Sequence, residues 1–300
     1  MSKVLLFGAS GFVGRHVREA LERDPRVSDV DSPGRDRHDL LRDDVAALTR
    51  LVAQSAPDVV INCTGRLTGT AEELLQANAM VTGKLIDAVS AVAPGIRLVR
   101  LGSAAEYGPV RGGRGVNEED RTNPVSEYGI SHLAGTQLMK LASGAGRIDG
   151  AVMRVFNPIG PGMHEENLLG RASAALRQAL RTDSQHIVLG KLDAYRDFVD
   201  VRDLAAAVVA AALAPALPKR VFNVGSGKAV TSREVVHVLA RTARYTGHIR
   251  EVGEGPLRSA GISWIQADID RASLVLGWRP AFDLGRSLED IWAGAVAEAR

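Results

Sequence analysis

A glycine-rich turn between an apolar strand and an amphipathic helix opens the chain, and it constrains the fold more than any other feature. Residues 4–7 are apolar, glycines follow as Gly8, Gly11 and Gly14, and a helical pattern continues to residue 23. Gly8 permits a tight turn, Gly11 lets the backbone approach a ligand, and Gly14 lets the helix lie against the strand. The free N–H groups at the helix start attract phosphate. The pattern predicts a dinucleotide site.

Strands and helices alternate along the first half of the chain, which predicts a doubly wound parallel sheet. Strands are expected at residues 3–7, 27–30, 59–62, 96–101 and 151–155, with helices at 12–23, 45–54, 72–92 and 127–141. The later part is less regular, with a helix at 168–180, a strand at 187–189, a helix at 203–213, a strand at 221–224 and a capped helix after Thr231.

We therefore expect an α/β protein of the Rossmann type with a smaller C-terminal substrate-binding lobe. The dinucleotide-binding domain is expected to span residues 1–156, with later segments near 196–224 returning to it. The lobe is expected to comprise residues 157–195 and 225–300.

Composition excludes several other classes of protein. The net charge of +2 includes no basic block, so nucleic acid is not an expected partner. The one cysteine, Cys63, excludes an internal disulfide and suits a reducing cytoplasm. The first strand leaves no room for a signal peptide. The most apolar segment, residues 204–217, is shorter than the roughly 20 residues of a membrane span and contains Pro215. We expect a cytoplasmic protein with no membrane contact and no metal site.

Two segments carry groups that suit proton and hydride chemistry. Ser103 follows the strand at 96–101, and Tyr128 and His132 lie four residues apart at the start of the helix at 127–141. A serine hydroxyl can donate to a substrate oxygen, and a tyrosine can exchange the proton that accompanies hydride transfer. Each residue also has an ordinary structural interpretation: Ser103 as a cap, Tyr128 as a half-buried aromatic and His132 as a surface residue.

The sequence resembles the extended short-chain dehydrogenase/reductase family, in its nucleotide-sugar branch. The resemblance rests on motifs in the family's order: the glycine turn, Asn62-Cys63-Thr64-Gly65, Asn78 with Gly83, Ser103 with Tyr107-Gly108, Tyr128, Arg154-Val155-Phe156-Asn157, Gly160-Pro161-Gly162, residues 195–203, Phe222-Asn223-Val224-Gly225-Ser226-Gly227 and Leu276-Gly277-Trp278-Arg279-Pro280. Residues 102–108 and 190–198 are most similar to reductases of GDP-4-keto-6-deoxy-mannose.

The resemblance implies site residues along the whole chain. Catalytic roles fall on Ser103, Tyr128 and His132. The cofactor, NAD(H) or NADP(H), would contact Gly8, Ser10, Gly11, Phe12, Val13, Gly14, Asp31, Arg35, Asp39, Leu40, Cys63, Thr64, Gly65, Asn78, Tyr128 and His132. A nucleotide-diphosphate sugar would contact Ser103, Ala104, Asn157, Asn167, Arg196 and Arg258. The resemblance also implies a homodimer through the helices near 72–92 and 127–141.

The residues leave two questions open about the ligands. Asp31 favours NAD(H), because a carboxylate accepts from a ribose 2′-hydroxyl and repels a 2′-phosphate. Arg35 and Arg37 could neutralise that phosphate, so NADP(H) stays open. Arg196 fits a diphosphate, since guanidinium pairs bidentately with phosphate, but it is followed by Asp197 and could form a surface salt bridge instead.

Missing residues restrict the reaction. Dehydratases of this branch carry an acid pair just after the catalytic hydroxyl, whereas this chain has Ala104 and Ala105. Glu106 comes one residue later, and alternation along an extended segment would point it away from the side that Ala105 faces. Dehydration is therefore not expected. A 4-ketoreductase or a 4-epimerase remains.

His132 is the main departure from the family, which has lysine at this position. Imidazole titrates near ~6.5, so most of the lysine's charge is lost at neutral pH. We expect any proton retained on His132 to assist Tyr128 electrostatically, and His132→Lys to preserve or raise reductase activity. The departure leaves two hypotheses: a reductase of nucleotide-linked 4-keto-6-deoxy sugars, and a cofactor-binding protein without turnover.

Overall fold

The computed structural model describes residues 1–253 and 261–297. Its strands are β1 Ser2–Phe7, β2 Val27–Asp31, β3 Val59–Asn62, β4 Arg97–Ser103, β5 Asp149–Val155, β6 Pro158–Ile159, β7 His186–Leu189, β8 Tyr195–Asp197, β9 Val199–Asp200, β10 Val221–Val224, β11 Ala229–Thr231 and β12 His248–Glu251. Its α-helices are α1 Phe12–Arg23, α2 Val45–Ser55, α3 Ala71–Leu75, α4 Val81–Val92, α5 Glu127–Gly144, α6 Leu168–Thr182, α7 Val201–Leu213, α8 Ser232–Thr242, α9 Asp270–Leu276 and α10 Leu284–Ala297, with a π-helical turn η1 Gln76–Met80 and a 3₁₀ turn η2 Ala104–Glu106.

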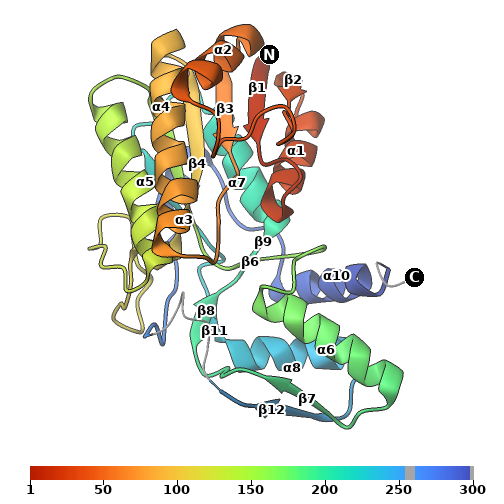
Figure 1. Cartoon of the computed structure of the whole chain (residues 1–300). Coiled ribbons are helices and arrows are strands. Elements are labelled where there is room, and N and C mark those ends of the chain that lie inside the picture. The colour runs from red at the N-terminus through yellow and green to blue at the C-terminus, as the bar shows by residue number, and fades with distance from the viewer. Residues whose placement is uncertain (254–260, 298–300) are drawn as a thin grey trace.

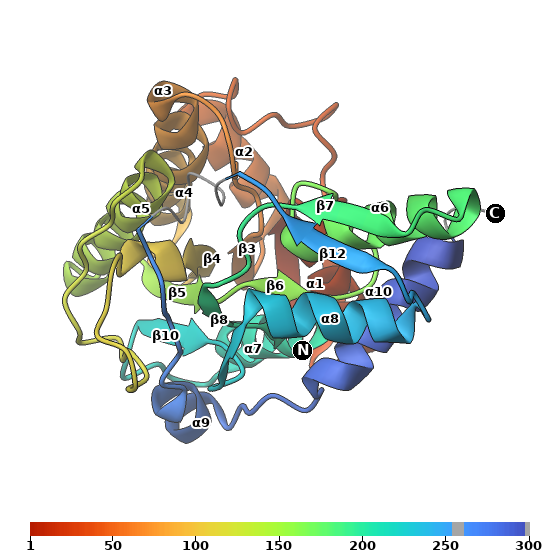
Figure 2. The ribbon, with the colours of Figure 1, turned by 90° about the horizontal axis from the view of Figure 1, so that it is seen from below.

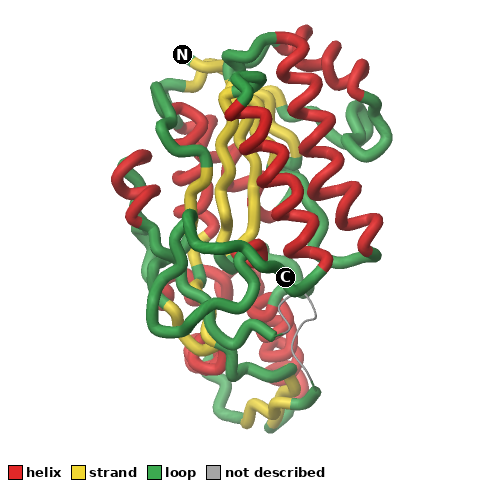
Figure 3. Tube along the Cα trace, turned by 90° about the vertical axis from the view of Figure 1, so that its left-hand side faces the viewer, coloured by secondary structure: helices red, strands yellow, loops and turns green. Residues whose placement is uncertain are grey.

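A six-stranded parallel sheet organises the upper part of the molecule in Figure 1. The strand order is β10-β5-β4-β3-β1-β2, and every neighbouring pair is parallel. On one side of β1 lies β2, and on its other side β3, β4, β5 and β10 follow in chain order, as in a doubly wound sheet. The predicted α/β fold class is confirmed. In Figure 3 the strands lie between two layers of helices.

The two faces of the sheet bury separate cores because alternate side chains point to opposite faces. Leu6 packs into the core beneath α1 and α7, whereas its neighbour Leu5 packs into the core beneath α2 and α4. Both side chains are 0% exposed, and complete burial of a leucine contributes about 1.5–3 kcal/mol. This two-sided burial explains the unbroken apolar runs of β1 and β3, at residues 4–7 and 59–61.

A second group of elements forms the lower part in Figure 1, seen from below in Figure 2. Helices α6, α8 and α10 share a third core, and β7 pairs in parallel with β12 beside it. Asp203 of α7 holds the segment that directly precedes α10. Its carboxylate accepts from the backbone N–H groups of Ala281 and Phe282 at 2.9 and 3.0 Å.

Local differences from the predicted elements occur next to the site. The helix predicted over 72–92 is interrupted by the π-helical turn η1, which carries Asn78. π-helical turns are rare and recur at functional sites. Residues 104–106 form the 3₁₀ turn η2 rather than an extended segment, so the alternation argument for Glu106 used the wrong backbone conformation. The helix predicted from 203 begins at Val201, because Asp200 caps it by accepting from Arg202 N at 2.8 Å.

Candidate active site

The glycine turn has the close backbone approaches that its sequence predicts. Gly8 has φ +82°, and a Cβ there would lie 2.9 Å from the carbonyl carbon of Cys63. A Cβ on Gly14 would lie 1.9 Å from the oxygen of Gly8, so only glycine fits. Helix α1 starts after Gly11 without a side-chain cap. These contacts fit a cofactor pyrophosphate at the helix start, beside Ser10, Phe12 and Val13.

The carboxylate predicted to face the adenosine ribose lies at the end of β2. Asp31 Oδ2 accepts from Ser55 Oγ at 3.0 Å, which fixes the orientation of the carboxylate. Arg35 is exposed in the loop that follows, Leu40 is buried, and Asp39 Oδ1 accepts from a backbone N–H at 3.0 Å. The arrangement holds a carboxylate and a nearby exposed guanidinium, so it is compatible with either dinucleotide.

The loop after β3 lies beside the glycine turn and is held by Asn78. The Asn78 amide donates to the Arg66 carbonyl and to Ser131 Oγ, each at 3.0 Å, and accepts from Arg66 N at 2.9 Å. This amide therefore positions the loop that carries Thr64 and Gly65. Burial raises the pKa of Cys63 to about 12, so its thiol stays protonated and suits packing beside a cofactor rather than reaction.

Ser103 and Tyr128 reach the same edge of the sheet from different elements. Ser103 is the last residue of β4 and Tyr128 lies in the first turn of α5. The two elements approach closely, since a Cβ on Gly129 would lie 2.6 Å from the oxygen of Ala105. Ser103 Oγ accepts from Ala105 N at 3.2 Å, so this serine does cap the turn η2. The hydroxyl hydrogen remains available for a ligand oxygen.

His132 corrects one expectation directly. Its ring centroid lies 4.5 Å from that of Tyr128, but the side chain is buried rather than on the surface. Burial, with the charge of Arg100, lowers the pKa of His132 to about 3. The imidazole is therefore neutral across working pH, and the expectation that a protonated His132 assists Tyr128 is wrong.

A buried charge network under the site was missed at the sequence level. Glu106 Oε2 accepts from Arg154 Nε at 2.8 Å, and Oε1 accepts from Ser103 N and Thr136 Oγ1 at 3.1 and 2.9 Å. Glu106 is 0% exposed, and both of its carboxylate oxygens are engaged by these partners. Charged residues inside apolar strands, such as Arg100 and Arg154, were the available signal.

The predicted substrate residues lie farther along the chain. Asn157 follows β5 and donates to the Asp197 carbonyl at 2.8 Å, while Asn167 precedes α6. Arg196 donates to the carbonyls of Tyr195 and Ile262 at 2.9 and 2.7 Å.

The alternative of an Arg196–Asp197 ion pair is not what the structure has. The Asp197 carboxylate accepts from Ser226 and from the backbone N–H groups of Gly227 and Ala267. The buried face of Ala104 packs near Tyr107. Arg258 lies outside the described residues.

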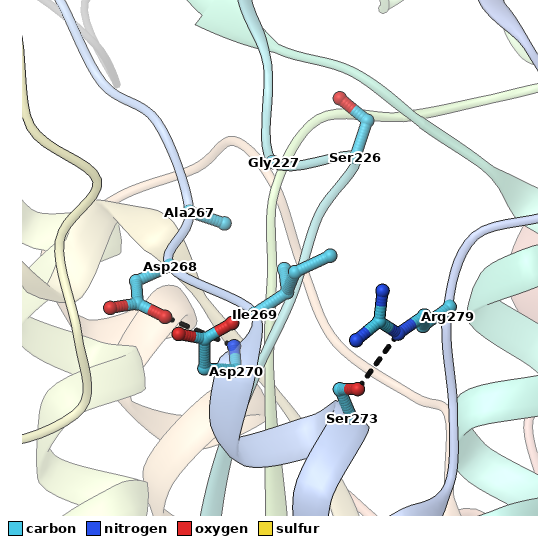
Figure 4. Close-up of a pocket in the computed structure, with 8 residues that line it drawn as sticks. All are labelled: Ser226, Gly227, Ala267, Asp268, Ile269, Asp270, Ser273 and Arg279. Atoms are coloured by element: carbon cyan, nitrogen blue, oxygen red, sulfur yellow. Dashed lines mark hydrogen bonds between the residues drawn. The ribbon is translucent and has the colours of Figure 1, made fainter.

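A surface pocket of about 290 Å³ lies elsewhere, between the turn after β10 and the start of α9. Figure 4 shows its lining, where Arg279 Nε donates to Ser273 Oγ at 2.9 Å and Asp270 N to Asp268 Oδ1 at 3.0 Å. It contains none of the predicted site residues, so the candidate site is defined by the sheet edge.

Comparison with known proteins decides the family. The model of the NAD dependent epimerase/dehydratase family matches residues 4–225. The chain belongs to this family. Its glycine turn, Ser103 and Tyr128 all fall inside the matched region. The predicted resemblance is thus confirmed.

Relatives within the epimerase/dehydratase family cover nearly the whole chain. The chain is 36% identical to dTDP-6-deoxy-L-talose 4-dehydrogenase (NAD(P)(+)) of Kitasatospora kifunensis, over 97% of this chain and 95% of that one. It is 28% identical to GDP-6-deoxy-D-mannose reductase of Pseudomonas aeruginosa, over 99% of both. The structure of RMD from Pseudomonas aeruginosa complexed with NADPH has a TM-score of 0.88 and 25% identity over 99% of this chain and 98% of that one. Within residues 1–253 and 261–297, no helix has the length and apolar content needed to cross a membrane.

Proposed function

We propose that the protein is an NAD(P)H-dependent reductase of a nucleotide-linked 4-keto-6-deoxy sugar. The observation that carries the proposal is the convergence of Ser103, Tyr128 and the Gly8 turn on one edge of the parallel sheet. Ligands of open α/β sheets bind at this carboxyl edge. The names of the relatives from Kitasatospora kifunensis and Pseudomonas aeruginosa, both enzymes of 6-deoxy sugars, support this substrate class.

The side chains supply what reduction of a ketone requires. A bound nicotinamide supplies the hydride. Tyr128 gives its phenolic proton to the substrate oxygen, and the Ser103 hydroxyl donates a hydrogen bond to the same oxygen. Neutral His132, beside Tyr128, takes the place where the family has lysine, and we assign it a role in positioning the cofactor ribose.

The lower part of the molecule is proposed to hold the nucleotide sugar. In this division, residues 157–195 and 225–300 bind substrate, and residues 1–156 with the segment near 196–224 bind the dinucleotide. Asn157 and Asn167 lie in the first of these segments, and Arg196 directly follows it. Arg196 is half-buried with its ends anchored on two carbonyls, so the charge is held in place for an anionic group such as a diphosphate.

A 4-epimerase is the second candidate. The observation that favours it is the buried Arg100 near Tyr128, because an oxidising first step needs a stabilised tyrosinate. The two candidates differ in stoichiometry: a reductase consumes one cofactor per product, whereas an epimerase regenerates it.

A homodimer in the cytoplasm completes the proposal. The α3–η1 segment and α5 expose several large apolar side chains, at Leu75, Met80, Ile130, Leu138 and Leu141. Their burial between two copies would remove water from a surface that is otherwise costly to expose. Light scattering would report a dimer in the native protein and a monomer after Leu141→Glu, whereas a native monomer would contradict this assembly.

The proposed function is tested by ligand protection followed by turnover. Nucleotide sugars that bind only the folded state raise the unfolding temperature by mass action, so a panel identifies the substrate class. Tyr128→Phe should keep this protection while lowering kcat by about 10²–10⁴-fold, the contribution of a positioned proton donor. Protection without turnover in the native protein would favour the non-catalytic alternative, and full turnover by Tyr128→Phe would remove Tyr128 as the donor.

A further inference from the structure

A buried arginine contacts His132, the ring that lies against the proposed proton donor Tyr128. Arg100 is on β4 and is 3% exposed. Its Nη1 donates to the His132 carbonyl and to Thr136 Oγ1, each at 3.1 Å. Its Nη2 donates to the Asn78 carbonyl at 3.2 Å and lies 3.5 Å from His132 Nδ1. The guanidinium is thus enclosed between the sheet and α5.

The interior around Arg100 holds more positive than negative charge. The charged and ionisable groups that act on it are Glu106 from η2, Arg154 from β5 and Tyr128 from α5. Glu106 pairs with Arg154 at 2.8 Å, and in the part of the chain that the structure describes Arg100 forms no ion pair. Of these groups only Tyr128 can add a second negative charge, by losing its phenolic proton.

Two neighbours bear on which ring nitrogen of His132 carries the hydrogen: Arg100, which lies 3.5 Å from Nδ1, and the backbone of Leu101, which also hydrogen-bonds the ring. Guanidinium has only donors, so a ring nitrogen that faces it must accept. With Nδ1 as the acceptor, the hydrogen of the neutral imidazole lies on Nε2. Burial and the charge of Arg100 lower the pKa of His132 to about 3, which agrees with a neutral ring.

We propose that Arg100 is a positioning residue for the proton donor: it holds His132 as the neutral Nε2–H tautomer, and its fixed positive charge stabilises the Tyr128 phenolate. The phenolate forms when the Tyr128 O–H bond breaks and its proton binds the substrate oxygen; the hydride that completes reduction of the carbonyl carbon would come from bound NAD(P)H. Solvent then returns a proton to Tyr128. The role of Arg100 in reducing a substrate rests on the proposed function. Its effect on the ionisation of Tyr128 does not depend on what the substrate is.

The arrangement reverses the expectation for His132→Lys. A lysine at this position would place a second cation beside Arg100 and would remove the Nδ1 acceptor. We expect His132→Lys to lose activity, and Arg100→Met combined with His132→Lys to recover at least half of the loss. In the double variant a single cation again lies behind Tyr128.

The direct test is the ionisation of Tyr128 in the cofactor-free protein. Tyrosinate absorbance is followed against pH, and the Tyr128→Phe spectrum is subtracted because the chain has 4 tyrosines. The rise in absorbance that Tyr128 contributes as it loses its proton is called the Tyr128 step. Arg100→Met should move the midpoint of this step upward by about one pH unit, the scale of losing a nearby opposite charge. Arg100→Lys should retain most of the native position, since it keeps the charge.

Arg97→Met is the matched control, because Arg97 is a buried arginine on the same strand whose partner is Asp149 rather than α5. A step that stays in place in Arg100→Met, or that moves equally in Arg97→Met, would overturn the proposal. In activity assays, Arg100→Met should lower kcat several-fold with little change in KM and move the alkaline limb of the pH profile in the same direction as the Tyr128 step.

The protonation state of the His132 ring can be measured in the native protein, so this test does not depend on whether a variant at Arg100 folds. Nitrogen NMR shifts of His132, assigned by their loss in His132→Gln, should report the neutral Nε2–H form at pH 6. A protonated ring or the Nδ1–H form would overturn the proposal. If the native protein has reductase turnover but Arg100→Met leaves the Tyr128 step in place, the proposed role of Arg100 is rejected and the proposed function is kept. If the step moves but the native protein turns over no nucleotide sugar, the proposed function is rejected and the role of Arg100 in ionising Tyr128 is kept.

Discussion

Removal of one partner of the buried Glu106–Arg154 ion pair should strongly destabilise the protein. The two side chains are 0% and 3% exposed, and they meet at 2.8 Å. Glu106→Gln keeps the shape but removes the negative charge, which leaves Arg154 and Arg100 as buried cations acting on each other. Removal of one partner of a buried ion pair costs about 3–5 kcal/mol. Because glutamine retains an acceptor for one of the present donors, we expect the lower end, about 3 kcal/mol.

Urea unfolding followed by circular dichroism measures this loss. Glu22→Gln is the matched control, since Glu22 is half exposed and, among the described residues, pairs with Arg18 alone, across one helical turn. The control should change the free energy of unfolding by less than about 0.5 kcal/mol. Glu106→Gln combined with Arg154→Met should recover at least half of the loss, because one unpaired cation is removed. A loss below about 1 kcal/mol in Glu106→Gln, or no recovery in the double variant, would refute this reasoning.

Three further predictions concern the ligands and pH. Arg196→Ala should weaken binding of a nucleotide sugar by about 1.5–3 kcal/mol, the scale of a charge-assisted hydrogen bond, while titration calorimetry finds dinucleotide affinity unchanged; equal loss of both affinities would point to a folding defect. Asp31→Ala should shift the ratio of kcat/KM values toward NADP(H) by about tenfold, since about 1.4 kcal/mol of repulsion is removed, and an unchanged ratio would take Asp31 out of the ribose site. The pKa of His132 is lowered on folding to about 3, so the unfolded chain binds the extra proton and stability falls as pH drops below about 6.5. Between pH 6.5 and 5 this contributes a loss of about 2 kcal/mol, which His132→Gln should lack; identical pH slopes in urea unfolding would contradict a buried neutral histidine.

The sequence pattern within a few residues was enough to predict those elements of the fold that depend on neighbouring residues alone. The glycine turn, the buried strands and the helix at Phe12–Arg23 each depend on sterics and periodicity within a few residues. The turn at Ala104–Glu106 was mistaken for extended chain because its 3₁₀ conformation depends on Glu106 reaching back to Ser103 N. The break at Gln76–Met80 was missed because no glycine or proline marks a π-helical turn.

The site was predictable where a single residue type carries the chemistry and was not where chemistry depends on packing. Ser103 and Tyr128 could be assigned from motifs, but the state of His132 depends on Arg100, a residue 32 positions away. An arginine within a strand otherwise rich in apolar residues was a visible signal of such a partner. The orientation of its guanidinium toward α5, however, follows only from the pairing of β4 with β5 and the packing of α5 above them.

The most direct test of the proposed reductase activity is its stoichiometry. Purified protein is mixed with NADH or NADPH and a panel of dTDP- and GDP-linked 4-keto-6-deoxy hexoses, while nicotinamide absorbance and the sugar product are followed together. We predict one cofactor oxidised for each C4 hydroxyl formed, on at least one member of the panel. Conversion of sugars without net cofactor oxidation would instead establish an epimerase, and no conversion of any member would contradict the account.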